Sequence, residues 1–387
     1  MKIVNSILMI SLLLTAGCRG NKQSADDMIT VDVTKSYSSK KELILQDFMD
    51  VEYIALETNS DFVNQGFVQA IGKEVILVKN YINDGDIFVY DRTGKAIRKI
   101  NRKGQGGEEY ISCRSITLDE DNNEMFINDH YARKIQVYDL EGHFKRSLKQ
   151  KQEGGTQFYL DIFNYDQDNL ICYDEINEEI PFLLVSKQDG SITKEIKTPF
   201  KEKKLFFQVL RSEEGTRAAG PDDYCRITPF NGSWILLEPS SDTIYTLMPD
   251  YSLRPFIART PPVHTMNPEI YLILRLVSDR YYFMEAIKNE YDFDQEKGFP
   301  KTYLVYDTQE KDFFRYIIYN GDYSDKEEIY MVRLTPVNQE GESWAPVDAF
   351  RLCEDYKKGK LKGKLKEIAA TLDEDSNPVI MLVKHKK

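Results

Sequence analysis

A repeated pattern of alternating apolar and polar residues organises most of the chain. Its first clear copy covers residues 87–94 and its second covers residues 135–142, and in both an aspartate is followed three positions later by a glycine. The alternation places apolar side chains on one face of a strand. Asp-x-x-Gly is typical of a tight turn, because glycine tolerates positive φ and aspartate accepts hydrogen bonds from nearby backbone amides. Each copy therefore predicts a β-hairpin.

The spacing of these copies predicts the architecture. Weaker copies follow at residues 182–190, 242–247 and 303–307, and a sixth apolar strand covers residues 379–383. Successive equivalent positions are 48, 47, 60 and 61 residues apart, and they are Tyr90, Tyr138, Val185, Tyr245 and Tyr306. A unit of about 50 residues accommodates the four short strands of a propeller blade, whereas a β-solenoid coil is shorter. We therefore predict an all-β fold, a six-bladed β-propeller of four-stranded antiparallel blades, with a pair of β-sandwiches as the alternative.

Two further segments complete this fold. A ring of blades closes when its last blade pairs with a strand from the N-terminus, and residues 29–33 or 51–56 are suited to supply that strand. Residues 355–372 are rich in lysine and predict a short helical insertion before the last strand. This stretch lacks the large aromatic face of membrane-surface helices, so we interpret it as solvated.

The N-terminal residues predict export and lipidation. Lys2 precedes an apolar run at residues 7–14, and the small residues Ala16 and Gly17 lead to Cys18, in the pattern of a bacterial lipoprotein signal. The apolar run is too short for a spanning helix, which needs about 20 apolar residues. We expect residues 1–17 to be a signal peptide, Cys18 to be lipidated, residues 18–28 to be a tether, and residues 29–387 to form the propeller.

Composition narrows the possible partners. The formal net charge is −12, and it becomes −13 without the signal, whose one charge is Lys2. Such a surface repels phosphate backbones, so we expect no nucleic-acid partner. The 24 tyrosines and 20 phenylalanines favour strands over a helical bundle. Cys113, Cys172, Cys225 and Cys353 contain no CxxC pair, and the sequence leaves their pairing open.

The segment at residues 102–110, Arg-Lys-Gly-Gln-Gly-Gly-Glu-Glu-Tyr, resembles a turn of the six-bladed β-propeller lipoproteins abundant in Bacteroides and its relatives. Residues 241–245 and 377–380 resemble that family's middle-blade and terminal strands, and the blade plan is similar to that of NHL-repeat propellers. The resemblance implies a lipid-anchored envelope propeller and no particular reaction. Arg19 follows the lipidation site, so an aspartate-type inner-membrane retention signal is absent. We therefore expect an outer-membrane lipoprotein, with the periplasmic or surface face undecided.

Candidate chemistry is sparse along the chain. The glycines at residues 104–107 lack the Gly-Lys-Ser/Thr of a phosphate-binding loop, so we interpret them as a turn between blades. No Gly-x-Ser-x-Gly elbow is present, and the four histidines lack metal-binding spacing. Asp129 and His130 precede a repeat strand and could face the channel, although solvated loop residues are the simpler interpretation. Trp344, flanked by polar residues, is the better exposed candidate for stacking on a ligand.

These observations favour a binding protein over an enzyme. We predict a monomeric, lipid-anchored envelope propeller that binds or scaffolds a glycan, a peptide or an outer-membrane protein, with no cofactor. Cys18 is the expected lipidation site, and Trp344, Asp129 and His130 are the expected ligand-binding residues. The alternative is a metal-dependent hydrolase, lyase or lactonase with its site at the propeller channel, for which the sequence identifies no metal ligands.

Overall fold

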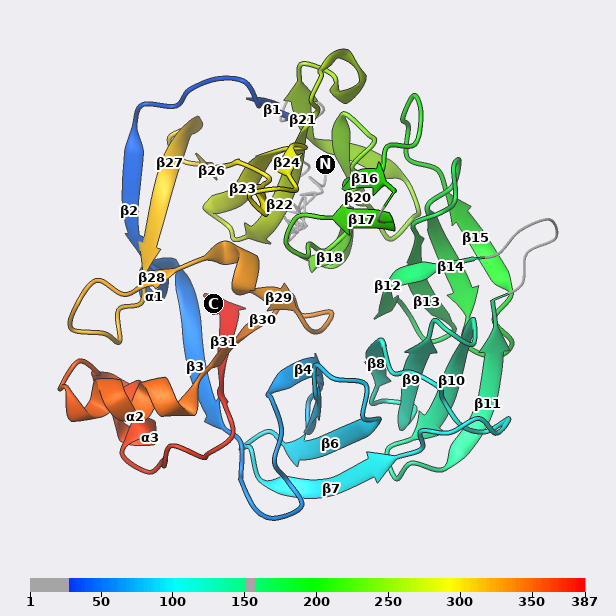
Figure 1. The fold of residues 1–387 in the computed structure, drawn as a ribbon, viewed down its shortest axis with the longest axis vertical. Helices are drawn as coiled ribbons and strands as arrows, with labels where there is room; N and C mark the ends of the chain where they lie inside the picture. The colour runs from blue at the N-terminus through cyan, green and yellow to red at the C-terminus, as the bar shows by residue number, and fades with distance from the viewer. Residues whose placement is uncertain (1–27, 151–156, 214, 387) are drawn as a thin grey trace, which may run out of the picture.

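The chain forms a ring of six antiparallel sheets around a central axis, which confirms the predicted six-bladed β-propeller (Figure 1). The structure is a computed structural model, and it describes residues 28–150, 157–213 and 215–386. We number the sheets blades 1 to 6. From the axis outward, blade 1 consists of β4 (Phe67–Ile71), β5 (Val75–Lys79), β6 (Asp86–Asp91) and β7 (Ala96–Asn101). Blade 2 consists of β8 (Ser115–Asp119), β9 (Glu124–Asp129), β10 (Lys134–Asp139) and β11 (Phe144–Lys149). Blade 3 consists of β12 (Tyr159–Asn164), β13 (Asn169–Asp174), β14 (Phe182–Ser186) and β15 (Ile192–Ile196).

The second half of the ring follows the same plan. In the same order, blade 4 consists of β18 (Ile227–Phe230), β19 (Ser233–Leu236), β20 (Thr243–Leu247) and β21 (Leu253–Thr260). Blade 5 consists of β22 (Ile270–Val277), β23 (Tyr281–Lys288), β26 (Lys301–Asp307) and β27 (Asp312–Tyr319). Blade 6 consists of β29 (Thr335–Pro336), β30 (Ser343–Val347), β31 (Val379–His385) and β3 (Met49–Ala55). The five positions predicted to be equivalent all lie on the third strand of their blades.

The Asp-x-x-Gly turns join the third and fourth strands and also pack against the preceding blade. Gly94 and Gly142 both have φ +87°. A Cβ atom at Gly94 would lie 2.1 Å from the carbonyl oxygen of Ala55 in blade 6. The Gly94 amide donates to the Asp91 carbonyl at 3.0 Å. Glycine is therefore required here both by the backbone angle and by the contact between blades.

The N-terminal segment runs along the outer edges of three consecutive blades before closing the ring. β1 (Ile29–Asp32) pairs in parallel with β21 of blade 4, and β2 (Lys40–Ile44) pairs in parallel with β27 of blade 5. After the short helix α1 (Leu45–Phe48), β3 pairs antiparallel with β31. Closure therefore comes from the second of the two predicted segments, and the first one extends blade 4 instead.

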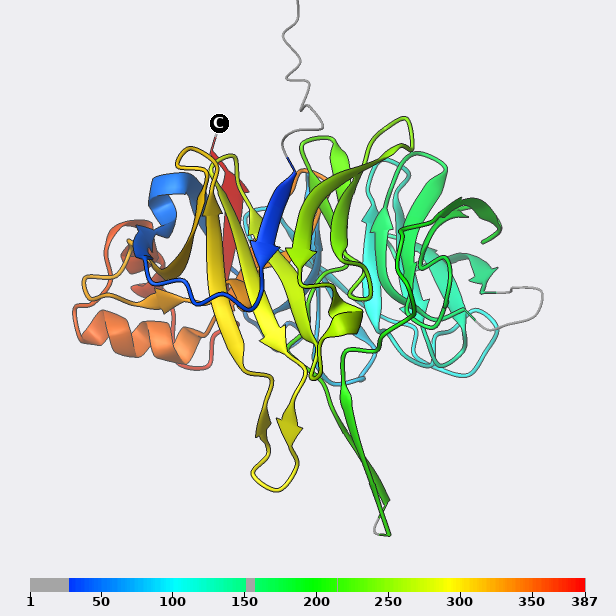
Figure 2. The ribbon, with the colours of Figure 1, turned by 90° about the horizontal axis from the view of Figure 1, so that it is seen from above.

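Three insertions extend connections that share one face of the ring. These connections join the second and third strands of a blade, or one blade to the next. The hairpin of β16 (Gln208–Ser212) and β17 (Gly215–Ala219) precedes blade 4, and the hairpin of β24 (Tyr291–Asp292) and β25 (Lys297–Gly298) lies within blade 5. Both project from what we call the hairpin face, and β1 begins on the opposite face (Figure 2). The predicted helical insertion in blade 6 is confirmed as two helices, α2 (Ala349–Lys357) and α3 (Gly363–Ala369). The remaining short elements are η2 (Val263–Thr265), β28 (Glu328–Ile329) and η3 (Met331–Arg333).

Apolar side chains of adjacent blades pack against one another and form the core. Between blades 1 and 2, for example, Leu77 and Val89 pack with Ile116 and Ile127, and all four are buried. Each blade thus buries its apolar face only when its neighbour is present. Among the described residues, no helix has the length and apolar character needed to cross a membrane.

Candidate functional site: the central cavity

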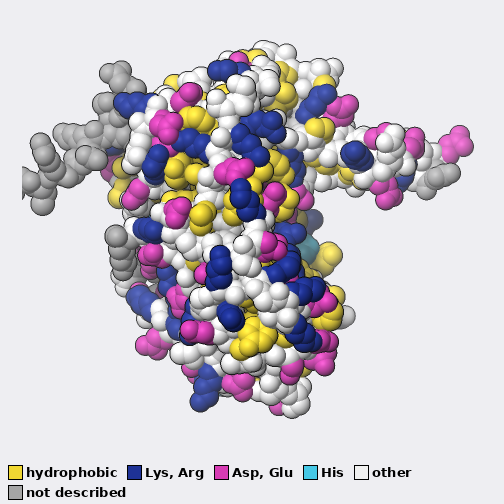
Figure 3. All heavy atoms as spheres, turned by 90° about the vertical axis from the view of Figure 1, so that its left-hand side faces the viewer, with side chains coloured by type: hydrophobic (Ala, Val, Ile, Leu, Met, Phe, Trp, Pro, Cys, Tyr) yellow, Lys and Arg dark blue, Asp and Glu magenta, His cyan; other side chains and the backbone are white. Residues whose placement is uncertain are grey.

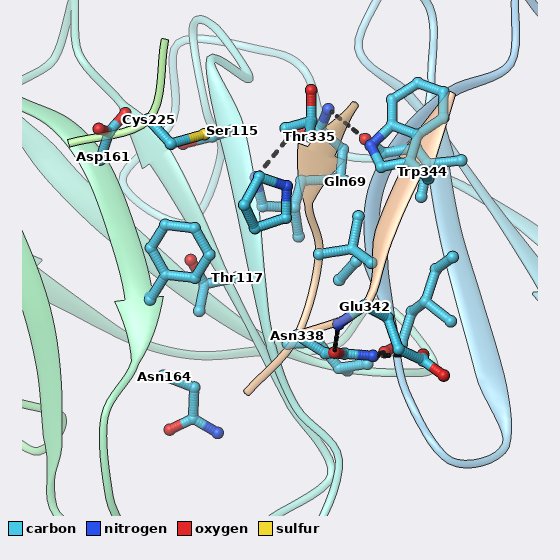
Figure 4. A pocket seen from close by; sticks show the side chains of 18 of the residues that line it. Gln69, Ser115, Thr117, Asp161, Asn164, Cys225, Thr335, Asn338, Glu342 and Trp344 are labelled. Carbon is cyan, nitrogen blue, oxygen red and sulfur yellow. Dashed lines mark hydrogen bonds between the residues drawn. The ribbon is translucent and has the colours of Figure 1, made fainter. Parts of the chain in front are cut away.

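A cavity of about 670 Å³ lies on the axis of the ring. The first strands of blades 1 to 3 form much of its wall, and further parts come from the segments 223–226, 274–275 and 334–340 and from Glu342 and Trp344. Figure 4 shows Ser115 and Thr117 on β8 facing the side of blade 6 that carries Asn338 and Trp344. A volume of this size suits a small ligand or a short oligomer.

Polar side chains join the inner strands that form this wall. The Gln69 side-chain oxygen accepts from the Ile116 amide at 3.1 Å, which links blade 1 to blade 2. The Thr117 hydroxyl donates to the Ile162 carbonyl at 2.8 Å, which links blade 2 to blade 3. These bonds hold the positions of the wall residues relative to one another.

The loop between β29 and β30 spans the cavity at the end away from the hairpin face. Asn338 donates to the Ile71 carbonyl of blade 1 at 3.1 Å, and its side chain also bonds Glu342 at 2.7 Å. Gln339 donates to the carbonyl oxygens of Asn164 and Tyr165 in blade 3. One end of the cavity is therefore bridged by a loop bonded to two other blades.

Arginines gather at the end nearer the hairpin face. The Arg226 guanidinium lies 4.1 Å from the Tyr224 ring centroid, and its Nη1 lies 3.6 Å from Asp161. Arg275 forms a buried ion pair with Glu285, with Nη2 and Oε2 2.7 Å apart. Burial alone would lower the pKa of Arg226, but Tyr224 and Asp161 outweigh it and raise that pKa. The Arg226 guanidinium is therefore cationic at neutral pH.

Several carboxylates of the wall already have structural partners. Asp119 pairs with the buried Lys187 of blade 3, with 2.6 Å between Nζ and Oδ2. The Glu120 carboxylate accepts from three backbone amides of the β4–β5 turn, among them that of Val75 at 3.0 Å. Burial raises the pKa of the Cys225 thiol to about 12, so this wall residue is protonated at neutral pH. Within the described ranges, no group of three or more His, Cys, Asp or Glu side chains is arranged to hold a metal ion.

Four polar atoms of the wall are buried without a hydrogen-bond partner. They are the indole Nε1 of Trp344, the Nε of Arg275, the hydroxyl of Ser115 and the side-chain oxygen of Asn164. An unsatisfied buried polar group costs about 1–3 kcal/mol, so such groups are usually bonded to water or a ligand. Two N–H donors, one acceptor and one hydroxyl in the same cavity are complementary to a polar ligand.

The predicted ligand-binding residues occupy different places. Trp344 lines the cavity, but it lies on β30, a central strand of blade 6, and is only 3% exposed. The expectation of an exposed Trp344 side chain is therefore wrong. Asp129 is fully buried and accepts from the Ile111 amide at 2.7 Å, so it is neither a solvated loop residue nor part of the cavity wall. His130 lies on the hairpin face beside Tyr131, with ring centroids 4.1 Å apart. Cys18 lies outside the described residues.

Other wall residues carried no sequence signal. Gln69, Ser115, Thr117 and Asn164 come together only because the first strands of different blades meet at the axis. The glycines of residues 104–107 lie in the connection between blades 1 and 2, as predicted. There the Glu109 carboxylate accepts a hydrogen bond from the Gly106 amide at 2.7 Å. The four cysteines of the described residues are unpaired.

Comparison with known proteins finds a family model and several similar solved structures. The model of a domain of unknown function, DUF4934, matches residues 28–384. A putative exported protein from Bacteroides fragilis NCTC 9343 is similar with a TM-score of 0.59 and 15% identity over 93% of this chain and 99% of that one. A DUF4221 member from Bacteroides vulgatus has a TM-score of 0.49 and 11% identity, over 88% and 99% of the two chains. A virginiamycin B lyase from Staphylococcus aureus has a TM-score of 0.39 and 11% identity, over 87% and 100%. Among curated proteins, none matches.

Proposed function

The chain belongs to the DUF4934 family of domains of unknown function, and from its own geometry we propose that it is a lipid-anchored envelope propeller that binds a polar ligand, a glycan, in its central cavity. The observation that carries this proposal is the buried Trp344, whose Nε1 has no partner and which lines the cavity together with Ser115 and Asn164. Sugars present hydroxyl groups that pair with such donors and acceptors, and their C–H faces pack on aromatic rings.

Two carboxylates of the wall, those of Asp119 and Glu120, have structural roles that favour binding over catalysis at these positions. A general acid or base needs a carboxyl group free to exchange a proton with the substrate. Asp119 and Glu120 instead join blades through Lys187 and the β4–β5 turn. The polar atoms left without partners, such as the Ser115 hydroxyl, suit recognition of a neutral ligand.

The proposed anchor is a lipid on Cys18. The sequence around it has the order Leu-Thr-Ala-Gly-Cys, and Arg19 follows, which favours delivery to the outer membrane. Two or more acyl chains on one cysteine are sufficient for stable anchoring. The tether would then join the propeller through β1, on the face opposite the hairpins (Figure 2).

Binding of the purified mature protein to a panel of oligosaccharides and polysaccharides tests this function. We expect saturable calorimetric binding to one class of glycan. Trp344→Phe, which removes the Nε1 donor, should weaken it about 5-fold, the equivalent of about 1 kcal/mol for one hydrogen bond. Trp234→Phe is the matched control, because Trp234 is also buried but does not line the cavity. Absence of binding to the whole panel, or equal losses in both variants, would contradict the proposal.

A further inference from the structure

The hairpin face carries most of the exposed large apolar side chains of the described residues. Sixteen such side chains are exposed, and all but Met28, Ile44, Ile97 and Tyr251 lie on connections or insertions of this face. The twelve are Val63, Tyr81, Ile82, Ile111, Tyr131, Ile176, Leu205, Phe207, Val209, Tyr330, Phe350 and Tyr356. Scattered apolar residues are normal on a protein surface, but their concentration on one face is typical of an interaction surface.

Five of these residues lie on neighbouring connections of blades 6, 1 and 2, and we call them the apolar strip: Val63, Tyr81, Ile82, Ile111 and Tyr131. Hydrogen bonds join these connections to one another. The Gln65 side chain accepts from the Tyr81 amide at 2.7 Å, and Asn83 donates to the Ile111 carbonyl at 3.3 Å. The Ser112 hydroxyl lies 3.3 Å from Nδ1 of His130, the neighbour of Tyr131.

The apolar strip does not stabilise the propeller through its exposed parts. Ile82 is 61% exposed and Tyr131 is 69% exposed. Burying an aliphatic or aromatic side chain is favourable, and these two leave most of that contribution unused. A partner that covers the strip would gain it.

The charge of two other loops of the hairpin face, in blades 3 and 5, indicates what kind of partner fits. On the same face, the loop 175–181 contains three glutamates and no lysine or arginine, and the segment 289–300 contains four acidic residues and one lysine. Glu178, Glu179, Asp294 and Glu296 are exposed. In Figure 3, Asp and Glu side chains gather on the part that projects to the right.

Acidic loops disfavour an anionic lipid surface as the occupant and favour a basic one. The position of β1 leads to the same choice, because a lipid attached through the N-terminal segment would hold the opposite face toward its membrane (Figure 2). We propose that the hairpin face is a docking surface for a partner protein whose contact area is apolar at its centre and rich in lysine and arginine at its rim. This surface is separate from the central cavity, so the proposal goes beyond the glycan-binding function.

Photo-crosslinking in the intact envelope is the first step of the test. A photoreactive amino acid is placed at Ile82 or Tyr131, and at Ile97 as the control, because Ile97 is similarly exposed but lies on β7. We expect one crosslinked protein from the two hairpin-face positions and none from Ile97. The protein identified by mass spectrometry is then purified, and its affinity for the full-length lipoprotein in detergent is measured.

The second step distinguishes this partner from other occupants. We expect the affinity to fall at least 10-fold in the Ile82→Ser/Tyr131→Ser variant. It should fall by a similar factor in the Glu179→Lys/Asp294→Lys variant, and it should decrease as salt is raised. Glu195→Lys, an exposed change on β15, is the charge control. Three crosslinking results would overturn the proposal: equal crosslinking from Ile97, no crosslinking from any position, or crosslinks only to a second copy of the chain. An affinity unaffected by salt would also overturn it, as would flotation of the Cys18→Ala protein with phosphatidylglycerol vesicles.

Discussion

Asn377 joins the two ends of the chain, and its removal should weaken closure of the ring. Its Nδ2 donates to the carbonyl oxygens of Glu57 at 2.9 Å and Phe62 at 2.7 Å, and its Oδ1 accepts from the Asn64 amide at 2.8 Å. The residue is 2% exposed. It immediately precedes the β31 region that pairs with β3, so these bonds attach the C-terminal strand to the loop that enters blade 1.

The expected cost follows from the three bonds. Each contributes about 0.5–1.5 kcal/mol, so Asn377→Ala should lower the free energy of unfolding by about 1.5–4.5 kcal/mol. Asn377→Asp should cost at least as much at neutral pH, because it replaces the donor with a carboxylate that faces two carbonyl oxygens. Asn83→Ala is the control; its side chain is exposed and makes one bond of 3.3 Å, so we expect a change within about 0.5 kcal/mol.

Urea unfolding followed by tryptophan fluorescence measures these differences, since Trp344 reports on blade 6 and Trp234 on blade 4. The transition midpoint should shift in Asn377→Ala while the denaturant slope stays constant. An Asn377→Ala protein as stable as the Asn83→Ala control would refute the assignment of ring closure to this residue.

Three further predictions follow from other contacts of the ring. Gly94→Ala should destabilise the protein by more than Gly232→Ala, because both glycines have positive φ but only at Gly94 would the new Cβ meet backbone; equal losses in thermal denaturation would contradict this. Lys187→Met should lower the free energy of unfolding in urea by about 3–5 kcal/mol, because it leaves Asp119 buried and unpaired. The Lys187→Met/Asp119→Leu double variant should recover much of that loss, and a double variant as unstable as Lys187→Met would contradict this. Burial would raise the pKa of Asp307, but hydrogen bonds from Arg280 and Lys41 outweigh burial and hold that pKa well below its ordinary value. The ionised Asp307 therefore stabilises the fold above the unfolded pKa of about 3.9, and this stabilisation is lost as the pH falls below that value. Asp307→Asn should accordingly flatten the acid side of the profile of stability against pH.

The sequence predicted the blades because their turns are encoded locally. Asp91 accepts from the Thr93 and Lys95 amides, and Gly94 supplies the positive φ of the same turn, so the hairpins and their period could be recognised without the fold. The two longer steps in the period correspond to the regions that carry the β16–β17 and β24–β25 hairpins. These insertions replace short connections and leave the third strands in place.

The cavity could not be predicted in the same way. Its wall combines residues from first strands that are about 45 positions apart, such as Gln69, Thr117 and Ile162, and only the packing of successive blades around the axis brings them together. Trp344 was expected to be exposed because Glu342, Ser343 and Pro346 surround it. Those neighbours do not show that β30 pairs on both sides, with β29 and β31, or that the indole packs against apolar residues of blade 1, which bury it.

The fluorescence of Trp344 tests the central claim most directly, namely that a glycan binds inside the cavity. The chain has two tryptophans, so the Trp234→Phe variant contains Trp344 as its only indole reporter. Titration with the glycan retained by the intact protein should change the emission of Trp344 saturably, with the midpoint found by calorimetry. Calorimetric binding without any change in that emission would place the ligand elsewhere and contradict the account.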